Sequence, residues 1–289
     1  MKLLTLRYIV PNRTSLSNSL LLTSFLFSFT LFAETKDRIV SVNGTVTEII
    51  YALQVNPLLV AVDSTSYYPK ETSSLPNVGY QRTLTTEGIL SFKPTFLIGL
   101  ETAGPKQTIQ NLRDTNIKVT LFADEYQLDT PAKRVLEIGK LFGKEKEAET
   151  LAKQIRTQIQ SLKLKKTNVK VLFIYSRNPS SVFISGTGTA AHSMIELSGA
   201  KNAITEFIEY KPLTTEALVK ANPDIILMPE KSAEGFGGTN AIWGIQGIEL
   251  TRAGKEKNLI LVDDLLLLGF GPRLPIVLKT LNEKWKQME

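Results

Sequence analysis

The chain has 289 residues, 43% of them hydrophobic and 21% charged, so it is long enough for two domains of a soluble globular protein. It contains no Cys, which excludes disulfides, thiolate metal sites, a cysteine nucleophile and a lipid-anchored N-terminal Cys. The net charge is +6, but residues 1–33 hold three basic residues and no acid. The remaining 31 basic and 28 acidic residues leave +3, which does not predict nucleic-acid binding.

The N-terminus has the pattern of an export signal. A basic segment with Lys2, Arg7 and Arg13 precedes an uncharged run of about 13 residues, 20–32, which is rich in Leu and Phe. Ala33 then offers a small residue for cleavage. The alternative is an uncleaved membrane anchor, but the run is shorter than the ~20 residues that span a bilayer. We therefore predict a cleaved signal peptide over residues 1–33 and an exported protein that is not a lipoprotein.

The first half of the remaining chain alternates short β-type runs with helical spacings of apolar residues, which is the pattern of a parallel sheet. Residues 34–143 are expected to form one α/β lobe. The expected strands are 38–42, 58–62, 96–100 and 117–122, and the expected helices are 45–53, 87–91, 105–115 and 130–142.

A long helix is predicted next. Residues 144–165 contain no Gly or Pro over 22 residues, which corresponds to a helix about 33 Å long. Its other faces are charged, and its apolar residues form one stripe: Ala148, Leu151, Ile155, Ile159 and Leu162. We interpret residues 144–166 as a connector between two lobes.

Residues 167–289 should form the second α/β lobe. We expect strands at 169–175, 182–185, 225–228 and 259–263, and helices at 190–197 and 275–288. A Gly-rich stretch, 235–247, and an apolar stretch, 265–273, are predicted to be loops.

An internal repeat relates the two halves. Residues 84–90 and 94–95 correspond to residues 213–219 and 223–224 at a constant offset of 129. Each copy has Thr residues that can cap a helix, a Glu in its first turn, and a Pro before an apolar strand. A Tyr precedes each copy, Tyr80 and Tyr210, one residue out of register. Two copies predict two similar lobes with a cleft between them, where small ligands bind.

Enzyme motifs are missing from the sequence. It has no Gly-x-Ser-x-Gly and no phosphate-binding Gly-x4-Gly-Lys-Ser/Thr, and residues 186–189 are better interpreted as a turn into a helix than as a dinucleotide loop. His192 is the only His and is expected near a helix start at the surface; one His without Cys cannot build an ordinary zinc or copper site. We predict that the protein is not an enzyme.

Tyr80 and Arg82 are the residues with distinctive chemistry. A Tyr in such a loop is usually a packed aromatic residue, but a phenolate is also a hard anionic ligand for ferric iron and a known axial ligand of haem. A cation two residues away favours the ionised form of Tyr. The residues therefore leave both interpretations open.

At these residues the sequence resembles the haem-binding periplasmic proteins of bacterial haemin ABC transporters. The similar segments are residues 78–84, 87–90 and 93–94, with 41–53, 63–65, 170–173 and 263–271, and they extend from Arg38 to the last helix. The broader group includes cobalamin- and ferric-siderophore-binding proteins. The resemblance implies the α/β fold class: two Rossmann-like lobes with parallel sheets, joined by one long bridging helix.

The resemblance also implies roles for residues. Tyr80 is the expected axial ligand to haem iron, with Arg82 as its neighbouring cation. Glu87 and Glu216 match the paired acidic residues that dock on the membrane permease. Some members have a His where this chain has Ser176-Arg177, so we expect a single Tyr ligand. Cations expected near the haem propionates are Arg177 and Arg273, and the expected pocket walls are Tyr67, Tyr68 and Phe270.

The resulting prediction is a periplasmic protein that captures ferric haem b between its lobes and delivers it to an inner-membrane ABC importer. An outer-membrane haem receptor system would act upstream, and the lobes should move only modestly. The alternative is the same scaffold binding a ferric siderophore, which supplies its own iron ligands, or cobalamin. An exported enzyme that acts on haem, or a cell-surface interaction domain, are further alternatives.

Overall fold

The computed structural model describes residues 37–178 and 181–289, together with all side chains in these ranges except that of Arg177. The predicted signal peptide, residues 1–33, lies outside the described residues. The described residues belong to one compact unit, which contains two sheets. Among the helices of this part of the chain, none is long and apolar enough to cross a membrane.

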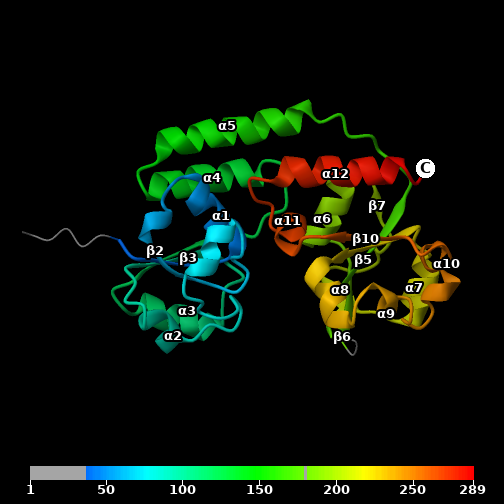
Figure 1. Cartoon of the computed structure of the whole chain (residues 1–289), viewed down its shortest axis with the longest axis horizontal. Coiled ribbons are helices and arrows are strands. Elements are labelled where there is room, and N and C mark those ends of the chain that lie inside the picture. Colours follow the sequence, from blue (N-terminus) through cyan, green and yellow to red (C-terminus); the bar gives the residue numbers. More distant parts are fainter. Residues whose placement is uncertain (1–36, 179–180) are drawn as a thin grey trace, which may run out of the picture. The chain divides into compact units, whose positions relative to one another are not determined.

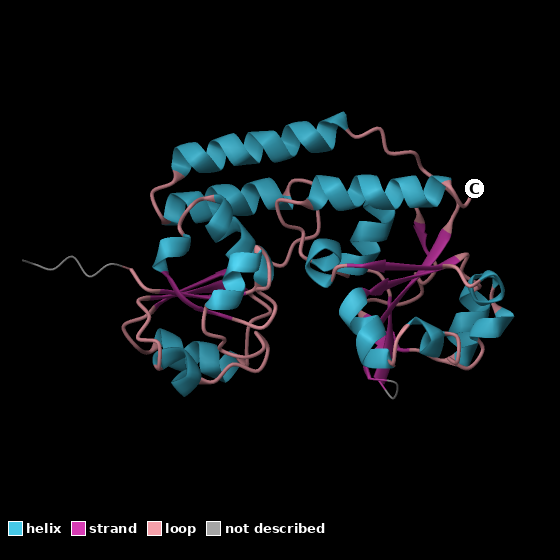
Figure 2. Ribbon diagram, in the orientation of Figure 1, coloured by secondary structure: helices cyan, strands magenta, loops and turns pink. Residues whose placement is uncertain are grey.

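The N-terminal lobe is built on a parallel sheet of four strands in the order β2-β1-β3-β4. Figure 2 shows helices on both sides of this sheet. The strands are β1 (Ile39–Val42), β2 (Leu59–Val62), β3 (Phe96–Leu100) and β4 (Lys118–Phe122). The helices are α1 (Gly44–Ala52), α2 (Thr86–Leu90), α3 (Lys106–Arg113) and α4 (Thr130–Leu141), and short 3-10 turns cover Asn56–Leu58 and Lys70–Ser74.

Alternating side chains give this sheet two apolar faces. Ile39 of β1 and Ile98 of β3 pack with α1 and α4, whereas Val40 and Leu97 pack with α2 and α3. A strand buried on both faces is expected for a parallel sheet covered by helices. The predicted N-terminal α/β lobe is therefore built as a three-layer arrangement.

The C-terminal lobe has a six-stranded sheet in which β10-β9-β5-β6-β8 are consecutive neighbours and β7 also pairs with β5. The strands β10, β9, β5 and β7 are parallel, whereas β6 and β8 are antiparallel, so this sheet is mixed. The strands are β5 (Lys170–Asn178), β6 (Ser181–Ser185), β7 (Lys201–Asn202), β8 (Tyr210–Pro212), β9 (Ile225–Pro229) and β10 (Leu259–Val262). The α/β fold class is confirmed, with parallel pairing dominant.

Helices replace two predicted loops in this lobe. The Gly-rich stretch contains the end of the helix Glu230–Phe236 and the whole helix Thr239–Ile242, because Phe236 and Ile242 are buried in the core. In the apolar stretch, the Asp263 carboxylate caps a helix by accepting from the Leu266 N–H at 2.8 Å. The helices are α6 (Ala190–Leu197), α7 (Thr215–Ala221), α8 (Glu230–Phe236), α9 (Thr239–Ile242), α10 (Arg252–Glu256), α11 (Asp264–Leu268) and α12 (Leu274–Lys286), with a 3-10 turn at Ile248–Leu250.

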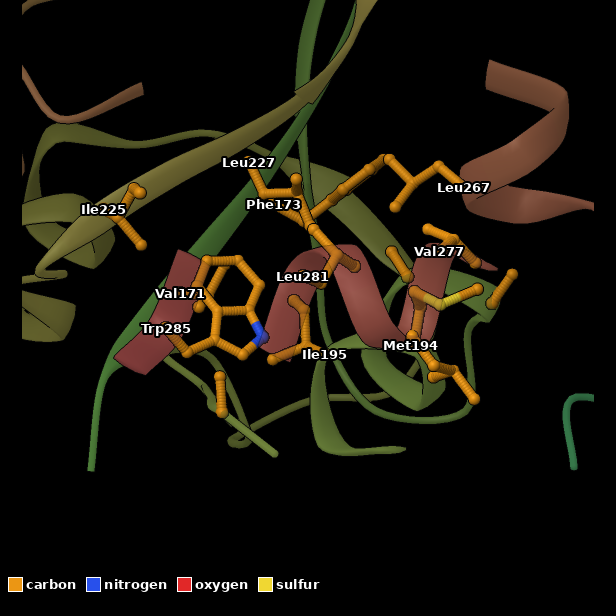
Figure 3. Close-up of a cluster of buried hydrophobic side chains, with 14 of the residues drawn as sticks. Val171, Phe173, Met194, Ile195, Ile225, Leu227, Leu267, Val277, Leu281 and Trp285 are labelled. Carbon is orange, nitrogen blue, oxygen red and sulfur yellow. The ribbon is translucent and has the colours of Figure 1, made fainter. Parts of the chain in front are cut away.

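Side-chain alternation again divides the core. Val171 and Phe173 of β5 and Leu227 of β9 face α6 and α12, and Figure 3 shows them around Trp285 of α12. The alternate residues Leu172 and Ile174 of β5 and Ile226 of β9 face α7 and α8 on the other side of the sheet. The Trp285 ring is fully buried, and its indole N–H donates to the Ser198 hydroxyl at 2.9 Å.

The predicted long helix is present but shorter than expected. Helix α5 (Glu145–Ser161) lies alongside α4 (Figure 1), and its Ala148 packs where Gly139 of α4 has no side chain. All strands of one sheet precede α5 and all strands of the other follow it, so α5 carries the chain between the sheets. Ile159 contacts the core clusters of both lobes.

The chain beyond α5 is extended. Leu162 and Leu164 both pack on the C-terminal core, and side chains two residues apart point to the same side in an extended chain but not in a helix. Asn282 of α12 fixes this segment. Its amide oxygen accepts from the Lys165 N–H at 3.1 Å, and its amide nitrogen donates to the Lys165 carbonyl at 2.7 Å. The same nitrogen donates to the Ser198 carbonyl at 2.8 Å.

The internal repeat is present in the backbone. Thr85 and Thr214 cap α2 and α7 by accepting from N–H groups three residues further on, each at 3.1 Å. Lys93 and Asn222, again 129 residues apart, both have left-handed backbone conformations before a Pro. Strands β3 and β9 then begin at the equivalent residues Phe96 and Ile225.

Replacing Asn282 with Ala should destabilise the protein. The side chain is 1% exposed and makes three hydrogen bonds to backbone groups, so its loss leaves buried donors and acceptors without partners. We expect the free energy of unfolding to fall by about 3 kcal/mol in urea denaturation. Thr280→Ala, at an exposed position of the same helix, should change it by less than about 0.5 kcal/mol. Equal stability of the two variants would contradict this account.

Candidate functional site

The loop that carries Tyr80 is held by backbone hydrogen bonds on both sides. The Ser64 N–H donates to the Gly79 carbonyl, and the Thr83 N–H closes a turn on the Tyr80 carbonyl, each at 2.9 Å. Gly79 has φ +91°, a conformation that favours glycine. These hydrogen bonds and the Gly79 conformation therefore define the turn.

Gln81 is the inward residue of this turn. It is 8% exposed, its side-chain oxygen accepts from the Asn43 amide at 3.1 Å, and its carbonyl accepts from the Gly104 N–H at 2.9 Å. Tyr80 and Arg82 flank this anchor; Tyr80 is half-buried and Arg82 is exposed. The Tyr-x-Arg motif thus fixes its middle residue and leaves the outer two on the surface of the loop.

Arg82 acts electrostatically on two further tyrosines, Tyr126 and Tyr210. Burial raises the pKa of Tyr126, Asp124 raises it further, and the charges of Arg82 and Arg134 lower it. Burial raises the pKa of Tyr210 to about 12, and the charge of Arg82 opposes this shift. The charge of Arg82 in the N-terminal lobe therefore acts on Tyr210 of the C-terminal lobe.

Tyr210 begins the edge strand β8. The residue is 40% exposed, and its ring lies 6.2 Å from the Phe173 ring, measured between centroids. The Thr189 hydroxyl and the Ala191 N–H, at the start of α6, stabilise its phenol oxygen. One side of this ring is thus packed on the C-terminal lobe and part of it remains available to a ligand.

Tyr67, Tyr68 and Arg273, three residues predicted to surround the ligand, are brought together where the lobes meet. The Arg273 guanidinium lies 3.6 Å from the Tyr68 ring and makes two 3.0 Å bonds to the Glu48 carboxylate. The Tyr67 oxygen accepts from the Leu265 N–H at 2.8 Å. Burial raises the pKa of Glu48, and the hydrogen bonds from Arg273 oppose that shift. Burial also raises the pKa of Tyr67; the Leu265 N–H opposes this shift, whereas the Asp263 carboxylate adds to it.

Phe270 also lies at this junction and is 1% exposed. Its ring is 5.4 Å from the Tyr126 ring, and its backbone has φ +47°, an uncommon conformation for a bulky residue. The buried Arg134 guanidinium donates to the Phe270 carbonyl at 3.4 Å and to the Ala123 carbonyl at 3.1 Å. Gly269 allows the chain to approach Thr45 closely, because a side chain at residue 269 would collide with the Thr45 hydroxyl.

The structure thus gathers the predicted residues into two groups. Tyr67, Tyr68, Phe270 and Arg273 take part in contacts between the lobes, whereas Arg82 lies towards Tyr126 and Tyr210. Arg177 is in β5, and its side chain lies outside the described part of the structure. The ligand roles of Tyr80, Arg82, Arg177 and Arg273 remain predictions, as do the three pocket walls.

A hollow of about 440 Å³, open to the surface, lies between residues 126–129 and α6. Tyr126 contributes to its wall, and so does His192. Within the described residues, no group of three or more His, Cys, Asp or Glu side chains could hold a metal ion.

Asn202 orients the His192 ring. The Asn202 side-chain oxygen accepts from the Ile204 N–H and its nitrogen donates to the Ser185 carbonyl, so the amide has one orientation. That nitrogen lies 3.2 Å from His192 Nδ1, which must accept, and the proton of a neutral ring is then on Nε2. In this arrangement the Nε2–H of a neutral His192 ring is a hydrogen-bond donor.

Glu87 and Glu216 lie at equivalent exposed positions in the first turns of α2 and α7. Figure 1 shows these helices in different lobes. No ion pair is found for either carboxylate within the described ranges, 37–178 and 181–289. Their placement matches the expected pair of acidic surface residues, whose docking role remains a prediction.

Sequence reasoning missed Tyr126 as a neighbour of Arg82. It follows Asp124 and Glu125 in a short polar segment without a motif, so only the folded chain places it there. Tyr210 did carry a signal, since it precedes the second copy of the repeat as Tyr80 precedes the first. Glu48, the partner of Arg273, is 225 residues distant in sequence, and no sequence signal connects the two residues.

Two solved structures of haem-binding proteins are similar to this chain. The periplasmic heme-binding protein RhuT from Roseiflexus sp. RS-1 is 36% identical, with a TM-score of 0.82 over 88% of this chain and 99% of that chain. The periplasmic heme-binding protein BhuT, in complex with two hemes, is 30% identical, with a TM-score of 0.81 over 87% and 98% of the two chains. The predicted resemblance to periplasmic haem-binding proteins is confirmed.

Two relatives compared by sequence carry other names. The uncharacterized ABC transporter substrate-binding lipoprotein YvrC of Bacillus subtilis is 29% identical over 82% of this chain and 76% of that protein. A vitamin B12-binding protein of Yersinia pestis is 23% identical over 74% and 76% of the two. These are substrate-binding proteins rather than enzymes, as predicted for this chain. Residues 39–265 match one family over most of the described length, and the chain belongs to it: the periplasmic binding proteins.

Proposed function

We propose that this protein captures haem through Tyr80 and delivers it to an ABC importer. The observation that carries the proposal is the pre-formed turn around Gln81, which presents Tyr80 and Arg82 on one loop. A phenolate suits ferric iron, and a nearby cation stabilises it. Support also comes from RhuT and BhuT, which are named heme-binding proteins.

Haem b in its ferric state is the proposed ligand. Its apolar faces need aromatic or aliphatic partners. The proposed walls are Tyr67 and Tyr68, and we add Tyr126 and Tyr210, on which the charge of Arg82 acts. Phe270 would contact haem only after the Tyr126 ring moves aside, because it is almost fully covered. Arg82, Arg177 and Arg273 are the proposed cations for the two propionates.

Delivery is proposed to involve a permease in the inner membrane. Glu87 and Glu216 are exposed at equivalent places on the two lobes, where they could pair with basic residues of such a partner. The proposal includes export by cleavage near Ala33 into the periplasm without a lipid anchor, unlike YvrC, which is named a lipoprotein. A haem receptor system in the outer membrane would supply the ligand.

Cobalamin is the second candidate ligand, because one relative is named a vitamin B12-binding protein. A ferric siderophore on the same scaffold would bring its own iron ligands. Neither of these ligands needs a phenolate from Tyr80. The two alternatives therefore predict binding that survives removal of the Tyr80 hydroxyl.

A haemin titration followed by visible absorption tests the haem proposal. The unmodified protein should bind saturably and show a phenolate charge-transfer band. Tyr80→Phe should lose that band and weaken binding by more than tenfold. Arg82→Gln should weaken binding about tenfold, because it removes a residue that supports a metal ligand. Tyr51→Phe, in α1 of the same lobe, is the control and should bind as the unmodified protein does.

The haemin titration and a parallel titration with cyanocobalamin separate the alternatives. Saturable binding of cyanocobalamin, with no haemin binding above an unrelated protein, would overturn the haem proposal and favour the second candidate. A charge-transfer band that persists in Tyr80→Phe would retain haem and assign the ligand to another tyrosine.

Arg273 and Glu48 can be tested as a matched pair. Glu48→Gln and Arg273→Gln break the same partly buried ion pair, so each should lower the free energy of unfolding by about 2 kcal/mol. Only Arg273→Gln removes the cation proposed for a propionate, and it alone should weaken haemin binding, by about tenfold. Equal haemin affinity in the two variants would contradict the propionate role of Arg273.

A further inference from the structure

The extended segment that follows α5 presents lysines to the solvent. Leu162 and Leu164 pack on the C-terminal core, whereas Lys163 and Lys165 between and after them are exposed. Neighbouring side chains of an extended chain point to opposite sides. Burial of the two leucines therefore directs the two lysines outward.

The second half of α12 adds lysines to the same surface. Asn282 of α12 holds the segment through its hydrogen bonds to Lys165, and Figure 1 shows the chain after α5 passing the C-terminal end of this helix. We call the exposed lysines of residues 161–166 and 279–286 the lysine surface: Lys163, Lys165, Lys166, Lys279, Lys284 and Lys286.

A hollow of about 370 Å³, open to the surface, lies between the extended segment and α12. Lys163, Lys279 and Lys286 line it, and so do Leu162 and Leu164. The hollow thus combines three ammonium groups with apolar side chains.

The lysine surface accounts for the positive charge of the chain beyond the predicted signal peptide. The side chains of residues 34–289 have a net charge of +3, from 31 basic and 28 acidic residues. Residues 161–166 and 279–289 contain six Lys and two Glu, a net charge of +4, so the rest of this part of the chain is at −1. The positive charge is therefore concentrated on one surface.

The two acidic residues neutralise only part of this surface. The Glu283 carboxylate lies 3.9 Å from the Lys279 ammonium group, and Glu289 pairs with Lys165. Across residues 37–178 and 181–289, no ion pair is found for the other four lysines. Their ammonium groups are available to an anionic partner.

The residue types favour a lipid surface over a protein or a nucleic acid. Arginine has the planar group that suits fixed carboxylates and phosphates, and bases stack on exposed aromatic rings. The lysine surface has no Arg, and Trp285, the one aromatic residue of its two segments, is fully buried. Lysine is a point charge on a flexible stem, and clusters of about four to eight such cations attract anionic lipids.

We infer that the lysine surface binds the anionic phospholipid surface of a membrane, with lipid phosphates beside Lys163, Lys279 and Lys286. This contact does not depend on haem capture. Helix α12 packs on one face of the C-terminal sheet and α7 on the other, so the lysine surface is also separate from Glu216.

Vesicle sedimentation tests the inference, using the chain from residue 34 onward, which contains the whole folded unit. The protein should bind vesicles of phosphatidylcholine with about 30% phosphatidylglycerol but not vesicles of phosphatidylcholine alone, and added salt should weaken the binding. Combining Lys163→Gln, Lys279→Gln and Lys286→Gln should weaken it about hundredfold, because each lysine contributes about fivefold.

The matched control combines Lys106→Gln, Lys146→Gln and Lys255→Gln, which remove the same charge from exposed positions of α3, α5 and α10. This variant should bind the anionic vesicles nearly as the unmodified protein does. An equal loss of binding in the two triple variants would show a response to net charge alone and overturn the inference.

Two further results would overturn it: equal binding to both kinds of vesicle, or tighter binding to duplex DNA than to the anionic vesicles. Both triple variants should titrate haemin as the unmodified protein does. Failure of the lipid contact would therefore leave the proposed haem capture intact, and failure of haem capture would leave the lipid contact intact.

Discussion

The contact of residues 269–273 with the beginnings of α1 and α4 is the constraint on which the site depends. Thr45 donates to the Gly269 carbonyl at 3.0 Å, Arg134 donates to the next carbonyl, and Arg273 is held by Glu48. Separating the lobes would leave a buried guanidinium and carbonyl groups without partners, which is costly. Together with α5, whose chain leads from one sheet to the other, these bonds connect the two lobes.

The repeat gives the two lobes the same local architecture. Each lobe uses the same unit, a Thr-capped helix, a left-handed residue before Pro, and a central strand. Equivalent hydrogen bonds also attach the two units to their sheets: the Arg38 N–H donates to Thr95 at 2.9 Å, and the Lys170 N–H donates to Asp224 at 2.8 Å. The segments before the repeat differ: the N-terminal lobe has Tyr-x-Arg in a loop, whereas the C-terminal lobe has Tyr210 at the start of strand β8.

Much of this architecture could be predicted, because strands such as β5 and β9 consist of short apolar runs and α5 has a single apolar stripe. Elsewhere, burial of apolar side chains in the core outweighs the local preference of the sequence for a loop. Gly235 lies within α8 although Gly disfavours helices by about 1 kcal/mol, since Ala233 and Phe236 are buried there. At the site, Tyr80 and Arg82 form a local motif, whereas the pairing of Glu48 with Arg273 joins distant segments and leaves no local trace.

The most direct measurement of the central claim is a crystal structure of the mature protein grown with haemin, with iron located by its anomalous scattering. The account predicts iron at bonding distance from the Tyr80 oxygen, with the porphyrin between that loop and the C-terminal lobe. Iron bound at Tyr210, or in the hollow beside His192, would contradict the assignment of Tyr80 as the ligand.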